Sequence, residues 1–368
     1  MPKRERILRY FVIGGILLLA AVWSLASAGT GSAEGGYPNA DLLASADWLK
    51  KRLDDPDLII VDVRADDHFD GKLIPGAIRL PWSSFRYNEK ATNTGSLFVG
   101  TEQAQEILGE HGIGRTNTIV LYDSVERDGG ATASYLFWVL DVLGHEKKRV
   151  LERGIDAWQQ AGYDLDSRPK QLSPVLYQAP IQEIQGRRLI DGDFVYRRLG
   201  DPYYQIIDVR SRAEYLGEKG SRGLRGNPLK LGHIPTAVNI DYTSNWADPD
   251  TKAIKPYPQL QNLYRGLDPN KGVIVYCASG RRSSFSYFIL RLMGVENVYT
   301  YEASWLEWGN PAMFYPVETM ERKLAGSGLP TSVKRTAASS KAASEKAGGG
   351  ASGKAAGKPK GGYVSCGG

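Results

Sequence analysis

Cysteine and histidine are scarce in this chain, which has two cysteines and four histidines among its 368 residues. A fold held by disulfides needs several paired cysteines, so this chain must rely on apolar cores, for which its 42% hydrophobic content is ordinary. The few histidines form no cluster with the spacing of metal ligands. We therefore expect two globular domains, as the length indicates, without a metal site or a cofactor.

Basic residues are in excess, with a formal net charge of +5, but the excess lies at the two ends of the chain. Residues 327–368 carry a net charge of +6 and residues 1–9 carry +3, which leaves −4 for the segment between them. That segment has no basic surplus, so we expect no nucleic-acid partner. Residues 327–368 are rich in Gly, Ala, Ser and Lys and poor in apolar residues, and we expect them to be disordered.

The first 28 residues have the pattern of an export signal. Four basic residues precede the uncharged run Tyr10–Ala28, which ends in the small-residue triplet of a cleavage site. The same run is nearly long enough to span a bilayer, so an uncleaved membrane anchor through residues 10–28 is the alternative. Both alternatives predict that the rest of the chain is exported, to a bacterial periplasm or to the outer face of the inner membrane.

Two pairs of similar segments show that the chain between its ends is a duplication. Residues 58–85 resemble residues 205–246, and residues 118–158 resemble residues 273–308. We therefore expect two copies of one domain joined by a linker with several prolines. The expected domains span residues 38–168 and 186–320, and the linker spans residues 169–185.

Each copy alternates short apolar runs with segments of helical period. Continuous apolar runs are typical of strands buried on both faces, and they are Leu58–Val61, Ile119–Tyr122, Ile206–Val209 and Val273–Tyr276. Apolar residues at i, i+3, i+4 and i+7 within 136–143 and 285–292 predict helices with one buried stripe each. This alternation predicts an α/β fold in which mainly parallel sheets are covered by helices on both faces.

Cys277 stands where the last of these strands meets the following helix, the place at which reactive groups gather in parallel sheets. The aligned residue of the first copy is Asp123, and the loop after it is longer. Because the first copy has no thiol at this position, packing alone does not account for Cys277. We therefore take Cys277 as the candidate catalytic nucleophile.

The loop after Cys277 consists of small residues and two arginines. Its members are Ala278, Ser279, Gly280, Arg281, Arg282 and Ser283. A tight turn of this kind can direct backbone N–H groups at the sulfur, next to the positive end of the following helix. These N–H groups and the arginine charges favour the thiolate, so we expect a lowered pKa for Cys277. The six loop residues are therefore candidates for binding a small anionic substrate.

The second copy resembles the rhodanese family of sulfurtransferases. The motifs that carry the resemblance are Asp208-Val209-Arg210, Gly232-His233-Ile234-Pro235, Cys277 with its loop, and the segment 301–309. Over residues 40–318 the chain is similar to the tandem thiosulfate sulfurtransferases, in which only the second domain carries the cysteine. The resemblance implies two rhodanese-like domains, the first of them inactive.

The resemblance also implies a reaction. Cys277 would take the outer sulfur of thiosulfate, release sulfite and become a persulfide, which a thiol or cyanide then discharges. This chemistry needs a thiolate and a leaving group but no general base, so His233 is expected to be structural. Ser279 and Glu214 stand where well-known thiosulfate enzymes carry cationic residues, so a donor similar to thiosulfate is the alternative. No particular acceptor protein follows from the sequence.

Four further residues have roles that the sequence leaves open. Asp208 either orients an arginine at the site or makes a local pair. Arg210 is expected to form a buried ion pair, and Trp246 to line the mouth of the site. Cys366 is either inert or a mobile second thiol that accepts sulfur from Cys277.

Two other functions are alternatives to sulfur transfer by an enzyme. A phosphatase or arsenate reductase on a rhodanese-like fold uses a wider loop, with an arginine six residues after the cysteine. Here that position is Ser283, and Arg282 comes one residue too early. A non-enzymatic carrier of persulfide or selenium at the cell envelope would use the same thiol without rapid turnover.

Overall fold

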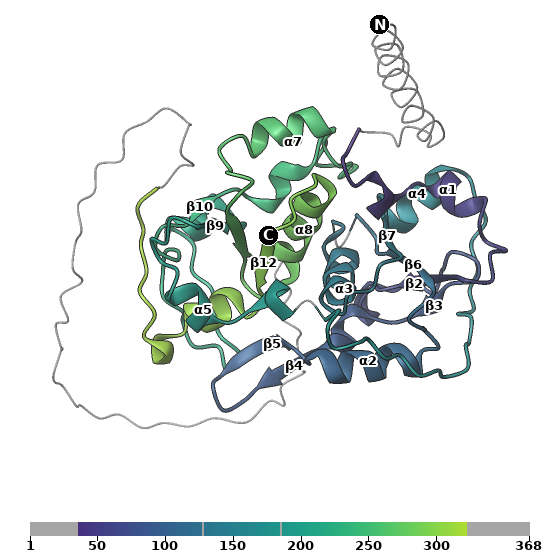
Figure 1. Cartoon of the computed structure of the whole chain (residues 1–368), viewed down its shortest axis with the longest axis horizontal. Helices are drawn as coiled ribbons and strands as arrows, with labels where there is room; N and C mark the ends of the chain where they lie inside the picture. The colour runs from purple at the N-terminus through teal and green to yellow at the C-terminus, as the bar shows by residue number, and fades with distance from the viewer. Residues whose placement is uncertain (1–35, 127–128, 185, 322–368) are drawn as a thin grey trace, which may run out of the picture. The chain divides into compact units, whose positions relative to one another are not determined.

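The computed structural model describes residues 36–126, 129–184 and 186–321 (Figure 1). The expected export signal at residues 1–28 and the expected disordered segment at 327–368, with Cys366, lie outside the described residues. Over the described ranges, we find no helix with the length and apolar character needed to cross a bilayer.

The first half of the chain forms a five-stranded parallel sheet with the strand order β1-β7-β6-β2-β3. The strands are β1 Leu43–Ala44, β2 Leu58–Asp62, β3 Ile78–Arg79, β6 Thr118–Tyr122 and β7 Lys148–Leu151. The helices are η1 Ala40–Leu42, α1 Ala46–Lys50, η2 Asp66–His68, η3 Trp82–Phe85, α2 Thr101–Glu110, α3 Ala131–Val142 and α4 Gly154–Gln160. An antiparallel hairpin of β4 Arg86–Glu89 and β5 Thr94–Phe98 follows η3.

The second half forms a second five-stranded parallel sheet, with the order β10-β9-β11-β12-β8. The strands are β8 Leu189–Ile190, β9 Tyr204–Asp208, β10 Val238–Asn239, β11 Gly272–Tyr276 and β12 Val298–Tyr301. The helices are η4 Gly186–Arg188, α5 Gly192–Tyr196, α6 Arg212–Tyr215, η5 Tyr242–Asn245, α7 Tyr257–Leu263, α8 Arg281–Leu292, α9 Ser304–Trp308 and η6 Pro311–Met313. Taken from β3 and from β10, the two sheets have the same topology, which is the duplication seen in the sequence.

The central strands are buried on both faces, as their continuous apolar runs indicate. In β2, Ile59 and Val61 face a core shared by the two halves, whereas Leu58 and Ile60 face a core of the first half alone. The alternation is repeated in β11, whose outward residues join a core of the second half. Because successive side chains of a strand point to opposite faces of the sheet, each apolar run contributes residues to two cores.

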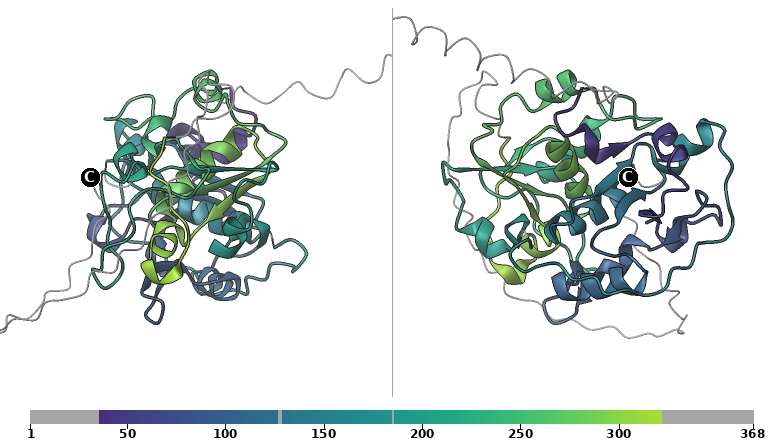
Figure 2. Two further views of the ribbon diagram at one scale, coloured as in Figure 1. Left: turned by 90° about the vertical axis from the view of Figure 1, so that its left-hand side faces the viewer. Right: turned by 45° about the vertical axis from the view of Figure 1, so that its right-hand side comes forward.

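Helices α3 and α8 lie next to each other between the two sheets (Figures 1 and 2). The predicted stripe residues are buried, but burial goes beyond one stripe, because every residue of α3 is buried and so is every residue of α8 from Ser283 to Leu290. Phe137 and Phe288 meet edge to face, with ring centroids 5.0 Å apart. Small residues permit a close approach, and the Ser284 hydroxyl donates to the Ala131 carbonyl at 3.3 Å. The N-terminal ends of both helices therefore lie at the junction of the halves.

Candidate active site

Cys277 follows the last residue of β11, and α8 begins four positions later at Arg281. The residue is 1% exposed and, within the described part of the chain, is a free cysteine. Its backbone N–H donates to the Ser304 hydroxyl at 3.1 Å, and its carbonyl accepts from the Trp305 N–H at 3.1 Å. Both partners belong to α9, so the cysteine backbone is held by a neighbouring helix.

The loop directs a backbone donor at the sulfur. The N–H of Ser279 donates to Sγ of Cys277 at 3.4 Å, and the first turn of α8 adds the partial positive charge of a helix N-terminus. Gly280 has φ +86°, and a Cβ there would lie 3.0 Å from Oε1 of Glu302. The tight turn expected from the sequence is therefore present, and it requires glycine at position 280.

The two arginines of the loop differ in their surroundings. Arg282 forms a bidentate ion pair with Glu214, with both N–O distances at 2.9 Å. Burial of Glu214 would raise its pKa, but hydrogen bonds and charge from Arg282 outweigh burial and lower the pKa to about 2. The charge of Arg282 is therefore compensated within the protein. The Arg281 guanidinium lies 5.9 Å from the centre of the Trp82 ring, which belongs to the first half.

Ala278 and Ser283 have structural contacts in the loop. The Ala278 carbonyl accepts from the Leu306 N–H at 2.9 Å. Ser283 is fully buried, and its hydroxyl donates to the Gly280 carbonyl at 2.8 Å. These contacts close the turn and fix the start of α8.

Asp208 and Arg210 form a fully buried ion pair at 2.6 Å, and the Tyr276 hydroxyl donates to the same carboxylate at 2.6 Å. The first half contains the same pair between Asp62 and Arg64, also at 2.6 Å. Because the pair is present in the half that lacks a cysteine, it favours the local structural interpretation of Asp208.

Trp246 contacts the loop of the first half, which leads from Asp123 to the start of α3 and contains Gly129. A Cβ at Gly129 would lie 2.8 Å from the Trp246 ring, and the ring meets Tyr242 edge to face with centroids 5.3 Å apart. Trp246 thus lies between the two halves, and its ring centroid is also 6.5 Å from that of Phe285 in α8. Its place at the mouth of the Cys277 loop stays a prediction.

Three residues near the loop were not identified from the sequence. Burial raises the pKa of Tyr242, the charges of Arg282 and Arg281 lower it in part, and its ring centroid lies 6.4 Å from that of Phe285 in α8. Arg86 of the first half donates to the Ser279 carbonyl, and it pairs with Glu302 at 3.4 Å. The contact between Arg86 and Ser279 spans 193 positions, so no local pattern signals it.

Asp123 occupies the position of Cys277 in the first half. Its carboxylate accepts from the Thr132 N–H at 3.1 Å, the Thr132 hydroxyl at 2.8 Å and the Ala133 N–H at 3.0 Å. Both N–H groups belong to the first turn of α3. The junction of strand and helix in the first half therefore binds an anionic group that the chain itself supplies.

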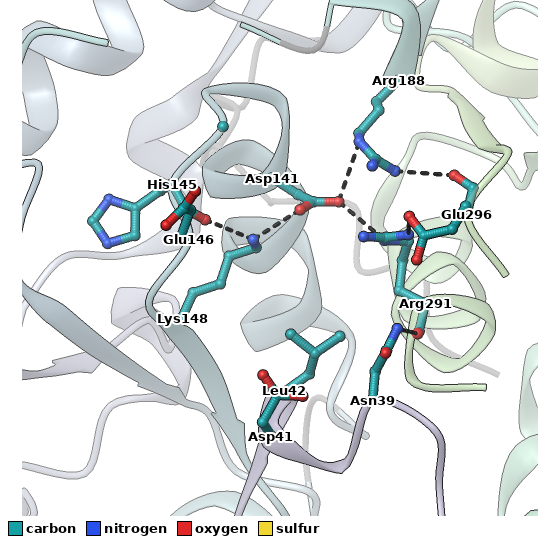
Figure 3. A pocket seen from close by; sticks show the side chains of 11 residues that line it. Asn39, Asp41, Leu42, Asp141, His145, Glu146, Lys148, Arg188, Arg291 and Glu296 are labelled. Carbon is teal, nitrogen blue, oxygen red and sulfur yellow. Dashed lines mark hydrogen bonds and ion pairs between the residues drawn. The ribbon is translucent and has the colours of Figure 1, made fainter. Parts of the chain in front are cut away.

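A polar cavity of about 440 Å³ lies at the opposite ends of α3 and α8 (Figure 3). Asp141 is surrounded there by Lys148 at 2.8 Å, Arg291 at 3.4 Å and Arg188 at 3.5 Å. Burial would raise the pKa of Asp141, but these three cations lower it to about 2. The cluster joins the two halves through ion pairs, and the lining residues include none of the candidate site residues.

No group of three or more His, Cys, Asp or Glu side chains in residues 36–126, 129–184 and 186–321 is arranged to hold a metal ion. His233 is buried, stacks on Tyr215 with ring centroids 3.7 Å apart, and hydrogen-bonds the Tyr215 carbonyl at 2.8 Å through Nδ1. These contacts are those of a structural histidine.

Comparison with known proteins agrees with this fold. The rhodanese-like domain matches residues 45–161 and again residues 192–311. The chain belongs to the rhodanese family, in its form with two tandem domains.

Several curated relatives cover most of the chain. A relative from Haloferax volcanii is 33% identical over 282 residues, which are 73% of this chain and 94% of that protein. The thiosulfate sulfurtransferase of Corynebacterium glutamicum is 30% identical over 301 residues, 77% of this chain and 93% of its own length. The sulfur carrier protein TtuD of Thermus thermophilus is 30% identical over 282 residues, 75% of this chain and 96% of its own length.

Solved structures with a similar fold include EanB in complex with ergothioneine. That structure has a TM-score of 0.65 and 25% sequence identity, and the match covers 77% of this chain and 71% of that chain. The anaerobic ergothioneine biosynthesis enzyme from Chlorobium limicola matches with a TM-score of 0.63 and 24% identity, over 79% of this chain and 72% of its own. The second match bears on the fold alone.

Proposed function

We propose that the protein is a sulfurtransferase in which Cys277 carries the transferred sulfur as a persulfide. The donor is thiosulfate or a similar small anion, and the acceptor is a thiol or cyanide. The relative named thiosulfate sulfurtransferase in Corynebacterium glutamicum supports this donor.

The reaction has two balanced steps. In the first, the Cys277 thiolate attacks the outer sulfur of thiosulfate, an S–S bond to the enzyme forms, and the S–S bond of thiosulfate breaks with its electron pair leaving on sulfite. In the second, the acceptor attacks the outer sulfur of the persulfide, and the Cys277 thiolate is released. Cyanide becomes thiocyanate, and a thiol becomes a persulfide.

One observation carries the proposal. A thiol that accepts an N–H from its own loop stands at a strand–helix junction, and the duplicate of that junction holds the carboxylate of Asp123. A site of this type stabilises negative charge on a small group, and a thiolate or a persulfide anion has that charge.

The test is steady-state thiocyanate formation from thiosulfate and cyanide by the full chain. We expect ping-pong kinetics, a mass increase of one sulfur atom on Cys277 after thiosulfate alone, and loss of both in Cys277→Ser. Cys366→Ser is the matched control, because it removes the other cysteine of the chain, and we expect it to keep full turnover. Turnover that persists in Cys277→Ser would refute the proposal, as would sulfur found on Cys366 in place of Cys277.

A persulfide carrier is the second candidate, and the similarity to TtuD, which is named a sulfur carrier protein, favours it. A carrier would load Cys277 once per molecule and discharge it slowly to small acceptors. Stoichiometric loading together with negligible turnover would therefore favour the carrier over the enzyme.

We also propose that the chain works outside the cytoplasm. The proposal rests on the basic and apolar pattern of residues 1–28. The intact mass of the protein from its native compartment distinguishes a cleaved signal from an anchor. Detection of the full-length chain in the cytoplasm alone would contradict export.

A further inference from the structure

Arg86 and Trp246 occupy equivalent positions in the duplicated fold. Each is the residue that follows a short 3₁₀ helix, η3 in the first half and η5 in the second. Each side chain reaches the loop of the other half, since Trp246 contacts Gly129 and Arg86 contacts Ser279. The two halves therefore exchange contacts, and the half without a cysteine contributes a cation to the Cys277 loop.

The Arg86 side chain is enclosed at this junction. It is 6% exposed, and it donates from Nε to the Ser96 carbonyl at 2.9 Å and from Nη2 to the Ser279 carbonyl. Its guanidinium also lies 4.7 Å from the centre of the Trp82 ring and 5.0 Å from that of Tyr135. A planar guanidinium held by a carbonyl on each side has little freedom to move.

Glu302 holds the guanidinium from the second half, at 3.4 Å. The Glu302 carboxylate accepts in addition from the Phe98 N–H at 3.1 Å and from the Tyr135 hydroxyl at 3.0 Å, both in the first half. The same carboxylate lies under Gly280, where a Cβ would meet it at 3.0 Å. Arg86 and Glu302 thus form one buried network that contacts the Cys277 loop at Ser279 and Gly280.

The hydrogen bond to Ser279 determines the direction of a peptide group. In a trans peptide the carbonyl and the following N–H point in opposite directions. Because the Ser279 carbonyl points to Arg86, the Gly280 N–H points away from it. Arg86 therefore fixes one N–H group in the turn that begins at Cys277, and the neighbouring Ser279 N–H is the one that donates to the sulfur.

We propose that Arg86 is a positioning residue for sulfur transfer, supplied by the first half, which holds the Ser279–Gly280 peptide so that the loop presents its N–H groups to the Cys277 sulfur. The proposal rests on the proposed function. Arg86 acts through the loop, because Nη1 is enclosed without a hydrogen-bond partner among the described residues and is closed to a substrate in solution.

Lys252 offers a matched control. It belongs to the second half, and it donates to the carbonyls of Val125 and Glu126 in the loop of the first half, the latter at 3.0 Å. Lys252 thus makes the reciprocal cation-to-carbonyl contact on the loop that has no cysteine. Lys252→Gln removes a contact between the halves without touching the Cys277 loop.

The test compares Arg86→Gln, Arg86→Lys and Lys252→Gln in the full chain. For Arg86→Gln we expect kcat for thiosulfate to fall about ten-fold to a hundred-fold, with KM changed by less than about three-fold, because the Ser279–Gly280 peptide loses the contact that orients it and no substrate contact is removed. We also expect the pH midpoint of Cys277 alkylation by iodoacetamide to move upward. Arg86→Lys keeps the positive charge but lacks the planar set of N–H donors of a guanidinium. We therefore expect its kcat and its alkylation midpoint to lie between those of the wild type and of Arg86→Gln. Lys252→Gln should keep the alkylation profile and kcat of the wild type.

Alkylation separates this proposal from the proposed function, since it needs no sulfur donor. If the wild type transfers no sulfur but the alkylation midpoint still moves in Arg86→Gln, the function fails and the positioning role stands. If Arg86→Gln matches Lys252→Gln in both alkylation and kcat, the positioning role is refuted. Should Arg86→Gln not fold, a wild-type midpoint and kcat in Arg86→Lys would refute it equally.

Discussion

The two halves of the molecule repeat one fold but place different groups at the same junction. In the first half, the Asp123 carboxylate accepts three hydrogen bonds at the start of α3. In the second half, Cys277 stands at the start of α8 and accepts the N–H of Ser279. The same strand–helix position thus directs backbone N–H donors at the group in its centre in either half, a carboxylate in one and a thiol in the other.

Replacement of Cys277 by aspartate, the residue at the equivalent position of the first half, should have the largest effect. We expect Cys277→Asp to lower kcat by at least about 10³-fold, because the nucleophile is lost. The unfolding free energy should change by less than about 2 kcal/mol, because the first turn of α8 can donate to a carboxylate as α3 does. Kinetics and urea unfolding measure the two quantities. A variant that cannot fold would show that the two junctions are not equivalent.

The far ends of α3 and α8 offer the second comparison. We expect Asp141→Ala to lower the unfolding free energy by about 3–5 kcal/mol, because three buried cations lose their shared partner. Among the molecules that remain folded, kcat should change by less than about two-fold, since this cluster lies away from the Cys277 loop. Glu296→Gln is the control, because its ion pair with Arg291 is exposed and is worth about 1 kcal/mol at most. Equal stability in both variants would contradict the role of Asp141.

The pH dependence of stability sharpens the contrast between the halves. Burial lowers the pKa of His145 in the first half to about 4 from its usual 6.5. Between pH 4 and 6.5 this histidine is protonated in the unfolded chain but neutral in the folded chain. Its neutral form therefore lets the protein keep its full unfolding free energy above pH 6.5, and that free energy falls as the pH drops toward 4. The loss should total about 3 kcal/mol. We expect His145→Gln to flatten this window and to leave the further loss near pH 2–4, which comes from Asp141 and Glu214. An unchanged slope between pH 4 and 6.5 would contradict this assignment.

Removal of the fixed anion in the first half should have the smallest effect. We expect Asp123→Ala to leave turnover nearly unchanged and to lower the unfolding free energy by about 1–3 kcal/mol, because the Thr132 and Ala133 N–H groups lose their acceptor. Thiocyanate formation and thermal unfolding provide the measurements. Collapse of activity in a folded variant would show that the first junction takes part in catalysis.

Much of the fold could be predicted from the sequence because its signals are local. The continuous apolar runs lie in β2, β6, β9 and β11, and the repeat predicted the common topology of the two sheets. The position of Cys277 at the end of a strand followed from the same runs. The buried stripe predicted for α8 was incomplete. Ser283 and Ser286 are buried although they are polar, and the prediction counted only apolar residues.

The rest of the site depends on contacts between distant segments. Glu214 was noticed as a departure from the family pattern, but its pairing with Arg282 needs the fold to bring α6 to α8. Arg86 has no local signal, since its contact with Ser279 joins segments 193 positions apart. Such contacts depend on how distant segments pack in the folded chain, and a pattern of neighbouring residues in the sequence does not contain this information.

The exchange of contacts between the halves has a consequence for a domain expressed alone. The second half would keep Cys277 and its loop but would lose the guanidinium that the first half donates to the Ser279 carbonyl. Under the positioning role proposed for Arg86, we therefore expect the separated second domain to carry the nucleophile without its full alignment.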